Sequence, residues 1–400
     1  MINKPILYGR QYISEEDIES VVETLKSDFL TQGPKIGAFE CAFANHTGAR
    51  YAVAVANGTA ALHLSALALS VKPGQKVITT PITFAASANC VRYCGGEVVF
   101  ADINPETYLL DIDEVKKLLQ ASPMGTYSGI IPVDFAGRAV NMEMYKTLAD
   151  EYGLWIIEDA CHAPGGFFTD SKDKRQLCGN GQFADLAIFS FHPVKHIACG
   201  EGGMITTNNK KLYEKLLVLR THGISRSQDS FTNDIMWASG NTTDKVISFP
   251  GWYMEMHELG YNYRLTDFQA ALGISQLQRA DAGLERRRTI AAQYAAAFKG
   301  KTWLKGQSCA VKGHAYHLYV IEANNRLGLY NFLRYKDIFA QVHYIPAHLM
   351  PYYRQQGYKQ GDYPNAERYY SRCLSLPMYP TLTDEEQGYV IETINSFYNG

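Results

Sequence analysis

One lysine of this chain stands where its amine is able to react with a carbonyl group. Lys195 lies in the segment SFHPVKHI, which follows the apolar run 185–189 and precedes the glycine-rich run 200–203. A lysine enclosed by apolar residues and a tight turn has a depressed pKa, because burial disfavours the charged ammonium. The neutral amine is the form that attacks a carbonyl to make a Schiff base. An arbitrary lysine is usually a solvated surface charge, so this prediction needs other groups that complete a site.

An acidic pair ends a second apolar run. Glu158 and Asp159 follow LWII (154–157), and His162 stands three positions after Asp159. An acid at the carboxyl end of a parallel strand lies where α/β proteins bind ligands. Pyridoxal phosphate (PLP) needs a carboxylate against its pyridine nitrogen, because the protonated ring is the electron sink. We predict this role for Asp159, with His162 near the ring hydroxyl; a helix-capping aspartate is the alternative.

A third segment has the character of a phosphate-binding turn. Gly58 and Thr59 stand where a β-rich run gives way to an Ala/Leu-rich helix. Free N–H groups at a helix start bind phosphate, and the Thr59 hydroxyl adds a donor. Ser190, five residues before Lys195, is placed to reach the same phosphate. Taken alone, residues 56–62 fit a plain strand-to-helix turn better than a phosphate site, but three motifs at strand ends together favour a PLP site.

The elements that must position these residues alternate between strands and helices up to about residue 215. A capped amphipathic helix is predicted over 14–25. Several strand candidates are apolar on both faces, which is typical of central strands in a parallel sheet covered by helices. The strand candidates are 51–56, 76–80, 97–103, 129–137, 154–160, 185–191 and 202–208.

The pattern changes after residue 226. Residues 227–258 are polar and rich in Gly, Asn, Asp and aromatic residues, which predicts a long excursion over the surface or across an interface. A helix is predicted from near Thr266, and a second, Lys/Arg-rich helix extends to residue 298. We therefore predict a large α/β domain over residues 1–260, N-terminal helix included, and a smaller α+β domain over 261–400.

Composition excludes several classes of protein. The 400 residues carry a formal net charge of −2, which gives no reason to expect nucleic acid or an anionic membrane as partner. The N-terminus has no basic-then-apolar leader pattern and no apolar run is long enough to span a bilayer. Eight cysteines without a CxxC pair indicate free thiols and no metal site. The expected compartment is the cytoplasm.

Six segments resemble one family. The sequence is similar to the DegT/DnrJ/EryC1/StrS nucleotide-sugar aminotransferases, which are PLP enzymes of fold type I, like aspartate aminotransferase. The resemblance runs from about residue 7 to 395 and implies a large, mainly parallel-sheet domain with a smaller α+β domain. The matching segments are 57–62, 158–163, 190–203, 220–224, 260–273 and 342–348.

The resemblance also implies roles for individual residues. Lys195 corresponds to the lysine that holds PLP covalently and moves a proton, with pyridoxamine phosphate as the intermediate. Asp159 corresponds to the partner of the ring nitrogen, and Phe84 to the aromatic residue that covers the ring. Asn262 matches a residue that reaches the phosphate from the other subunit, which implies a homodimer with shared active sites. Positions that match the phosphate site are Gly58, Thr59 and Ser190.

Four further segments, 8–34, 79–103, 133–137 and 346–354, resemble the UDP-4-keto-sugar aminotransferases of pseudaminic acid biosynthesis. This implies transfer of an amino group from L-glutamate, which leaves as 2-oxoglutarate, to C4 of a UDP-linked 4-keto-6-deoxy-N-acetylhexosamine. The implied product is UDP-4-amino-4,6-dideoxy-N-acetyl-β-L-altrosamine. Positions that match substrate contacts are Tyr8, Leu30, Thr31, Arg264 and His317; Arg264 fits equally well as an ion-pairing residue that holds its loop.

Three other functions are compatible with parts of this pattern. The first is an aminotransferase of the same family acting on another dTDP-, GDP- or UDP-linked keto sugar, since one fold serves many substrates. The second is a PLP-dependent sugar dehydratase, in which a histidine replaces the cofactor lysine, so Lys195 argues against it. The third is a non-catalytic PLP-binding regulator that keeps the pocket without turnover.

Overall fold

The computed structural model describes residues 5–241, 245–306 and 311–399. Seven strands form one sheet in the order β2, β10, β9, β6, β5, β3, β4. Strand β10 is antiparallel to both of its neighbours, and the other pairs are parallel. The predicted mainly parallel α/β sheet is therefore confirmed. The strands are β2 (Tyr51–Val55), β3 (Lys76–Thr79), β4 (Glu97–Phe100), β5 (Tyr127–Ile131), β6 (Trp155–Asp159), β9 (Leu186–Ser190) and β10 (Gly203–Thr207).

All seven predicted strands are present; five end one residue earlier than predicted, and β4 and β5 end three and six residues earlier. Strand β5 stops at Ile131, since Pro132 follows and has no N–H to donate to a ladder. Residues Phe135–Gly137 form the short helix η1 instead of extending the strand. Strand β4 ends at Phe100. The sequence did not indicate the hairpin of β7 (Phe167–Thr169) and β8 (Arg175–Leu177).

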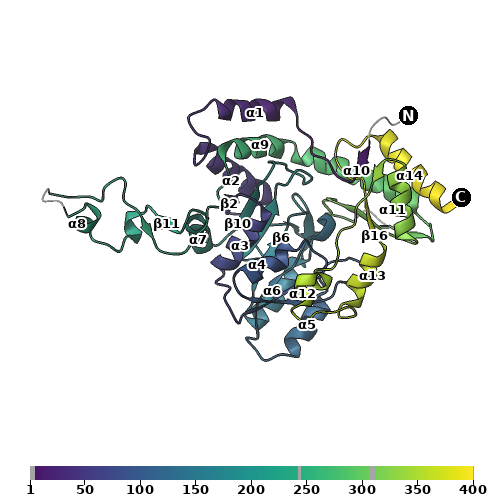
Figure 1. Ribbon diagram of the computed structural model, residues 1–400, viewed down its shortest axis with the longest axis horizontal. Helices are drawn as coiled ribbons and strands as arrows, with labels where there is room; N and C mark the ends of the chain where they lie inside the picture. The colour runs from purple at the N-terminus through teal and green to yellow at the C-terminus, as the bar shows by residue number, and fades with distance from the viewer. Residues whose placement is uncertain (1–4, 242–244, 307–310, 400) are drawn as a thin grey trace.

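Helices cover both faces of this sheet (Figure 1). Side chains alternate across a strand, so Leu186 and Ile188 of β9 join one buried cluster while Ala187 and Phe189 join another. The helices flanking the sheet are α2 (Pro34–Thr47), α3 (Gly58–Ala68), α4 (Ala86–Tyr93), α5 (Ile112–Gln120), α6 (Met142–Tyr152), α7 (Lys210–Arg220) and α9 (Asp267–Gln278).

The N-terminal helix α1 (Glu15–Leu25) begins as predicted. Ser14 and Asp17 cap it reciprocally: the Ser14 N–H donates to the Asp17 carboxylate at 2.9 Å, and the Asp17 N–H donates to the Ser14 hydroxyl at 3.4 Å. Helix α1 packs on α9, and the buried Asp17 accepts a hydrogen bond from Gln276 of α9 at 2.7 Å. The domain boundary at residue 260 stays a prediction.

The C-terminal part has its own sheet and hydrophobic cluster. Strand β14 (Tyr319–Ala323) lies between β13 (Leu304–Lys305) and β16 (Cys373–Leu376) with antiparallel pairing. The short β1 (Ile6–Leu7) pairs with β15 (Ile338–Phe339), which ties the N-terminal segment to this part. The remaining elements are α10 (Ala280–Phe298), α11 (Arg326–Tyr335), η3 (Ala347–Leu349), α12 (Pro351–Arg354), α13 (Pro364–Arg372) and α14 (Asp384–Asn399).

The described residues of the polar segment, 227–241 and 245–258, form an arm that projects from the body beyond α7 (Figure 1). At its base β11 (Ile224–Ser225) pairs with β12 (Glu255–Met256); it also contains η2 (Gln228–Ser230) and α8 (Ile235–Ala238). The arm confirms the predicted surface excursion. It exposes large apolar side chains, with Ile247 84% and Trp252 74% exposed.

The sequence predicts free cysteines and no membrane-spanning segment. The seven cysteines within the described ranges are free thiols, while Cys309 lies outside those ranges. Across the same ranges, no helix combines the length and apolar character that crossing a bilayer requires.

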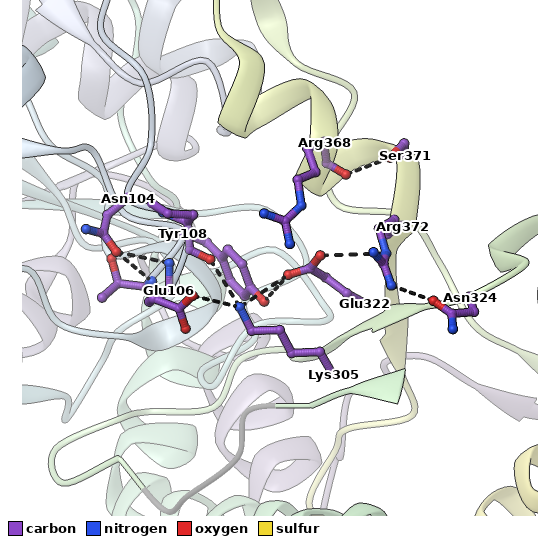
Figure 2. Close-up of polar contacts among 11 residues, drawn as sticks. Asn104, Glu106, Tyr108, Lys305, Glu322, Asn324, Arg368, Ser371 and Arg372 are labelled. Carbon is purple, nitrogen blue, oxygen red and sulfur yellow. Dashed lines mark hydrogen bonds and ion pairs between the residues drawn. The ribbon is translucent and has the colours of Figure 1, made fainter. Parts of the chain in front are cut away.

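A polar cluster joins the loop after β4 to the C-terminal sheet (Figure 2). Glu322 of β14 is buried and accepts a hydrogen bond from the Tyr108 hydroxyl at 2.8 Å. The Lys305 ammonium and the Arg372 Nε lie 3.8 and 3.9 Å from its carboxylate oxygens. Burying a carboxylate without partners destabilises the folded state. Glu322 therefore favours the arrangement that keeps Tyr108, Lys305 and Arg372 around it, and this arrangement holds the C-terminal sheet against the large sheet.

Removing the Tyr108 hydroxyl is expected to weaken this junction. Tyr108→Phe should lower the free energy of unfolding by about 1.5–3 kcal/mol, the usual range for a hydrogen bond to a charged group. Urea denaturation measures the change, with Tyr335→Phe as the matched control because Tyr335 is 80% exposed. A loss no greater than that of the control would show that the two cations alone stabilise Glu322.

Candidate active site

One cavity brings together the three predicted motifs. It has a volume of about 480 Å³ and opens where β6 and β9 end and α3 begins. The carboxyl end of a parallel sheet is the usual ligand site in this class of fold. Nine of the sequence-predicted site residues line it: Tyr8, Gly58, Thr59, Phe84, Asp159, His162, Ser190, Lys195 and His317.

Lys195 lies on the loop between β9 and β10. The loop is closed at its base, where the Phe191 N–H donates to Gly202 O at 2.8 Å, and the Lys195 N–H donates to His192 O at 2.8 Å. Burial lowers the pKa of Lys195 to about 8, although nearby Cys161 and Asp159 oppose the shift. A larger fraction of the amine is therefore neutral near pH 7 than in a solvated lysine, as the sequence predicted.

Asp159, the last residue of β6, is held by two donors. Its Oδ2 accepts from the Ser87 hydroxyl at 2.6 Å, and its Oδ1 accepts from the Cys161 N–H at 3.2 Å. The Ser87 oxygen lies 2.7 Å from the Thr83 hydroxyl. Since the Ser87 proton goes to Asp159, Thr83 donates to Ser87. These bonds orient a carboxylate that is 5% exposed and lines the cavity.

Two further acidic residues, Asp134 and Glu158, are buried next to Asp159. The Asp134 N–H donates to Asp159 O at 3.0 Å, and the side chains of Asp134, Glu158 and Cys178 bring their polar atoms within 4.8 Å of one another. Burial raises the pKa of Asp134 to about 7, and burial with repulsion from Asp134 raises that of Glu158. The two carboxyl groups therefore keep at least one proton between them near neutral pH. This limits the negative charge beside Asp159.

The amino end of α3 supplies free donors. Asn57 caps the helix, with its Oδ1 accepting from the Ala60 N–H at 2.8 Å. The N–H groups of Gly58 and Thr59 have no intrahelical acceptor, because they are the first two residues of the helix. A β-carbon on Gly58 would stand 3.0 Å from the Ser190 β-carbon, so the helix start and the end of β9 are closely apposed. This corner of the cavity suits an anionic group.

Two buried imidazoles border the lysine. The His317 Nε2 lies 3.4 Å from the Lys195 Nζ, and the His162 and His317 rings are 4.4 Å apart. Burial lowers the pKa of both histidines well below the usual value, so both are neutral near pH 7. The His162 Nδ1 accepts from the Ala136 N–H at 3.2 Å, so its proton is on Nε2 and is donated to the Tyr344 hydroxyl at 3.2 Å. The Tyr344 proton is then available to another acceptor.

Some residues that line the cavity were not predicted from the sequence. Ser87, Tyr344 and His343 line it, and Ser87 holds Asp159. Ser87 stands three positions after Phe84 at the start of α4, a spacing that places both on one side of a helical turn. Tyr344 lies in a segment that carries the family resemblance, but its contact with His162 spans 182 positions of the chain.

Four predicted site residues lie outside this cavity. Leu30 and Thr31 precede α2, and Thr31 pairs with Thr266 in an isolated bridge. Asn262 pairs with Thr221, and Arg264 pairs with Val55. They form a second group beside β2 and the start of α9, separate from the Lys195 cavity of the same chain.

Comparison with known proteins identifies the family. The model of the DegT/DnrJ/EryC1/StrS aminotransferase family matches residues 11–395. The chain is 39% identical to the spore coat polysaccharide biosynthesis protein SpsC of Bacillus subtilis, over 98% of this chain and 97% of that protein. It is 34% identical to the UDP-4-amino-4,6-dideoxy-N-acetyl-beta-L-altrosamine transaminase of Campylobacter jejuni, with 98% and 97% covered.

Solved structures show the same fold. Helicobacter pylori PseC, an aminotransferase of pseudaminic acid biosynthesis, aligns with a TM-score of 0.84 and 28% identity, covering 99% of this chain and all of that one. The PLP form of the putative sugar aminotransferase Spr1654 of Streptococcus pneumoniae aligns with a TM-score of 0.85 and 27% identity, with 99% of each chain covered. The fold is thus the α/β fold of PLP enzymes of type I.

The motifs, the cavity that unites them and a family match over nearly the whole length lead to one conclusion. The chain belongs to the DegT/DnrJ/EryC1/StrS aminotransferase family and is a sugar aminotransferase that depends on PLP.

Proposed function

We propose that the chain transfers the amino group of L-glutamate to C4 of a UDP-4-keto-6-deoxy-N-acetylhexosamine, giving UDP-4-amino-4,6-dideoxy-N-acetyl-β-L-altrosamine. The observation that carries the proposal is the cavity in which Lys195, Asp159 and the amino end of α3 meet. The name of the 34%-identical Campylobacter relative supports this sugar. The free thiols of the described cysteines suit a reducing compartment, and we propose the cytoplasm.

The residues of the cavity fit PLP. Lys195 would hold it covalently, Asp159 would keep the pyridine nitrogen protonated, and His162 would lie near the ring hydroxyl. Phe84 is 62% exposed at the cavity, so its ring is free to cover a planar group. When bound, the cofactor supplies the electron sink that amino transfer needs. The phosphate would be held by Gly58, Thr59 and Ser190.

The protein groups account for the proton transfers. Lys195 has a depressed pKa, so its amine is able to take a proton from one carbon and return it to another near pH 7. His317, neutral and 3.4 Å away, accepts a hydrogen bond from the lysine when the lysine is charged and so fixes its position. Tyr344 is a donor directed by His162, and we propose that it binds a substrate oxygen.

Substrate recognition is proposed to need a second subunit. Tyr8 and His317 line the cavity of their own chain, whereas Leu30, Thr31, Asn262 and Arg264 do not. In a homodimer with shared sites, the second group would contact the nucleotide sugar or the cofactor phosphate of the partner. The arm supports such an assembly, because its exposed Ile247 and Trp252 are apolar surface suited to burial against a second chain.

A second candidate is an aminotransferase acting on a different keto sugar. The 39% identity to SpsC, named for spore coat polysaccharide biosynthesis, is higher than the identity to the Campylobacter transaminase. In this reading the cavity and the roles of Lys195 and Asp159 are unchanged, and the substrate differs in its nucleotide or its sugar.

A substrate panel distinguishes the two candidates. Purified protein is incubated with PLP, L-glutamate and a set of UDP-, dTDP- and GDP-4-keto sugars, and products are identified by mass spectrometry and NMR. We expect one equivalent of 2-oxoglutarate per amino sugar, with the UDP-4-keto-6-deoxy-N-acetylhexosamine as the best substrate. Reactions without glutamate are the control. Efficient amination of a dTDP- or GDP-sugar alone, or amination at C3, would favour the second candidate.

A further inference from the structure

The turn formed by residues 134–137 contacts two residues of the active site. The Asp134 N–H donates to Asp159 O at 3.0 Å, and the Ala136 N–H donates to the His162 Nδ1 at 3.2 Å. The first bond fixes the main chain at the end of β6. The second keeps the proton of the neutral His162 ring on Nε2. The turn therefore orients both a carboxylate and an imidazole of the cavity.

The same turn contacts the C-terminal segment that carries His317. Gly137 O accepts from the Ala315 N–H at 2.7 Å. The approach is close, because a β-carbon on Gly137 would stand 2.9 Å from the main-chain nitrogen of His317. The His317 Nε2 is in turn 3.4 Å from the Lys195 Nζ. A displacement of the turn would therefore change the surroundings of the lysine.

The backbone of the turn needs support from outside. Ala136 has a φ of 59°, in the left-handed region that residues with a β-carbon rarely adopt. Such a conformation persists only where surrounding contacts hold it. The Asp134 carboxyl group provides one of these contacts, since its Oδ1 accepts from the Val140 N–H at 2.7 Å. This bond closes the chain over residues 134–140.

The other carboxyl oxygen of Asp134 lies beside a second acid. Asp134 is 0% exposed, and its Oδ2 is buried without a hydrogen-bond partner among the described residues. The polar atoms of Asp134, Glu158 and Cys178 lie within 4.8 Å of one another, and the nearby Asp159 adds repulsion. Two carboxyl groups buried this close share a proton, because both cannot stay charged. A proton shared with Glu158 supplies the donor that the Asp134 Oδ2 lacks.

From these contacts we propose that Asp134 is a positioning residue for amino transfer, and that the proton it shares with Glu158 keeps the turn in place. Both oxygens of the Asp134 carboxyl group are then held, one by a main-chain N–H and one by the shared proton. The turn in its place fixes His162 and the segment of His317 around the lysine. The inference rests on the proposed function, because the groups positioned are those proposed to perform the reaction.

Infrared spectroscopy of the full-length protein tests the shared proton. A protonated carboxyl group has a C=O stretching band separate from the bands of carboxylates. We expect this band at about pH 8, with and without PLP, although exposed carboxyl groups are ionised there. The double variant Asp134→Asn/Glu158→Gln should lose this intensity, and Glu151→Gln should keep it, because Glu151 is exposed on α6. Equal spectra of the wild type and the double variant would overturn the proposal.

Two substitutions of Glu158 test whether the hydrogen bond positions the site. Glutamine is able to accept from the Gly179 N–H, as Glu158 does at 3.0 Å, and to donate to Asp134, whereas methionine has a similar length and does neither. Glu158→Met should lower kcat by up to about 10²-fold, the loss that a shift of about 1 Å causes. Glu158→Gln should recover most of this loss. An equal loss in both variants would contradict the proposal.

NMR of isotope-labelled histidine separates positioning from stability. The His162 signal, assigned with His162→Gln, should show one tautomer, with the proton on Nε2, in the wild type and in Glu158→Gln. Glu158→Met should show a mixture of tautomers, and an unchanged His162 signal in this variant, if folded, would refute the role of the turn. If Glu158→Met does not fold, the infrared comparison still decides. Neither spectrum requires turnover, so both results are independent of the proposed reaction and its sugar.

Discussion

Lys195→Ala is expected to lower kcat for amino transfer by at least about 10⁴-fold, the scale seen when a residue that makes a covalent bond during catalysis is removed. Lys195 is the one lysine that lines the described cavity, and its amine has a pKa of about 8. Lys195→Arg should lose as much activity, because it keeps a positive charge but lacks a primary amine. Steady-state production of 2-oxoglutarate with the preferred keto sugar measures the loss.

The control for this pair is Lys172→Ala, since Lys172 is exposed on the turn between β7 and β8. It should retain the wild-type rate, and circular dichroism should show that all three variants are folded. Turnover by Lys195→Ala within tenfold of the wild type would contradict the assigned role. Full activity in Lys195→Arg would show that charge, not amine chemistry, is what the reaction needs.

Asp159→Asn is expected to lower kcat by about 10³-fold, within the range for loss of a group that controls a catalytic proton. The amide keeps an oxygen that accepts from Cys161 or Ser87, so the fold should be preserved, but it has no charge to hold a proton on a pyridine nitrogen. Ser87→Ala is a milder variant for comparison, because it removes one hydrogen bond to Asp159 and leaves the carboxylate unchanged. We expect it to cost roughly tenfold in kcat.

Parallel urea titrations separate catalysis from stability in this series. Asp159→Asn with wild-type turnover would remove Asp159 from the reaction. A variant that loses activity only in proportion to its unfolded fraction would instead mark Asp159 as structural. For Asp159→Asn we expect a near-native free energy of unfolding together with a large loss of kcat.

Much of the large sheet was predictable because its signals are local. Each central strand is a short apolar run, and Asp159 and Ser190 are the last residues of β6 and β9. Their placement at one edge follows from parallel pairing, so the meeting of Lys195, Asp159 and Gly58 could be inferred before the structure. The capping pair Ser14 and Asp17 is equally local, which is why the start of α1 was predicted correctly.

The residues that sequence analysis missed depend on contacts between distant segments. Tyr344 reaches His162 across 182 positions, and Ser87 reaches Asp159 across 72. The Arg287 side chain belongs to the predicted Lys/Arg-rich helix, yet it is 1% exposed, and its Nη1 donates to three carbonyl oxygens of other segments. The residue periodicity of one segment does not predict which distant segments it will contact.

The four predicted residues outside the cavity show a different limit. Leu30, Thr31, Asn262 and Arg264 cluster together, but a sequence match does not say whether a residue serves its own chain or a partner. Because they lie together beside β2, the hypothesis of a shared active site names the surface that the partner chain would contact. In the proposed homodimer these four residues would act in the partner's site, whereas the Lys195 cavity is lined by nine predicted site residues of its own chain.

We propose that Lys195 holds PLP in the cavity that it shares with Asp159. The most direct measurement is to load the protein with PLP, reduce it with borohydride and locate the modified peptide by mass spectrometry. We expect a phosphopyridoxyl group on Lys195, one per chain, and none at that position in Lys195→Arg. Stoichiometric labelling of another lysine, or no stable labelling of a folded protein that still transfers amino groups, would contradict it.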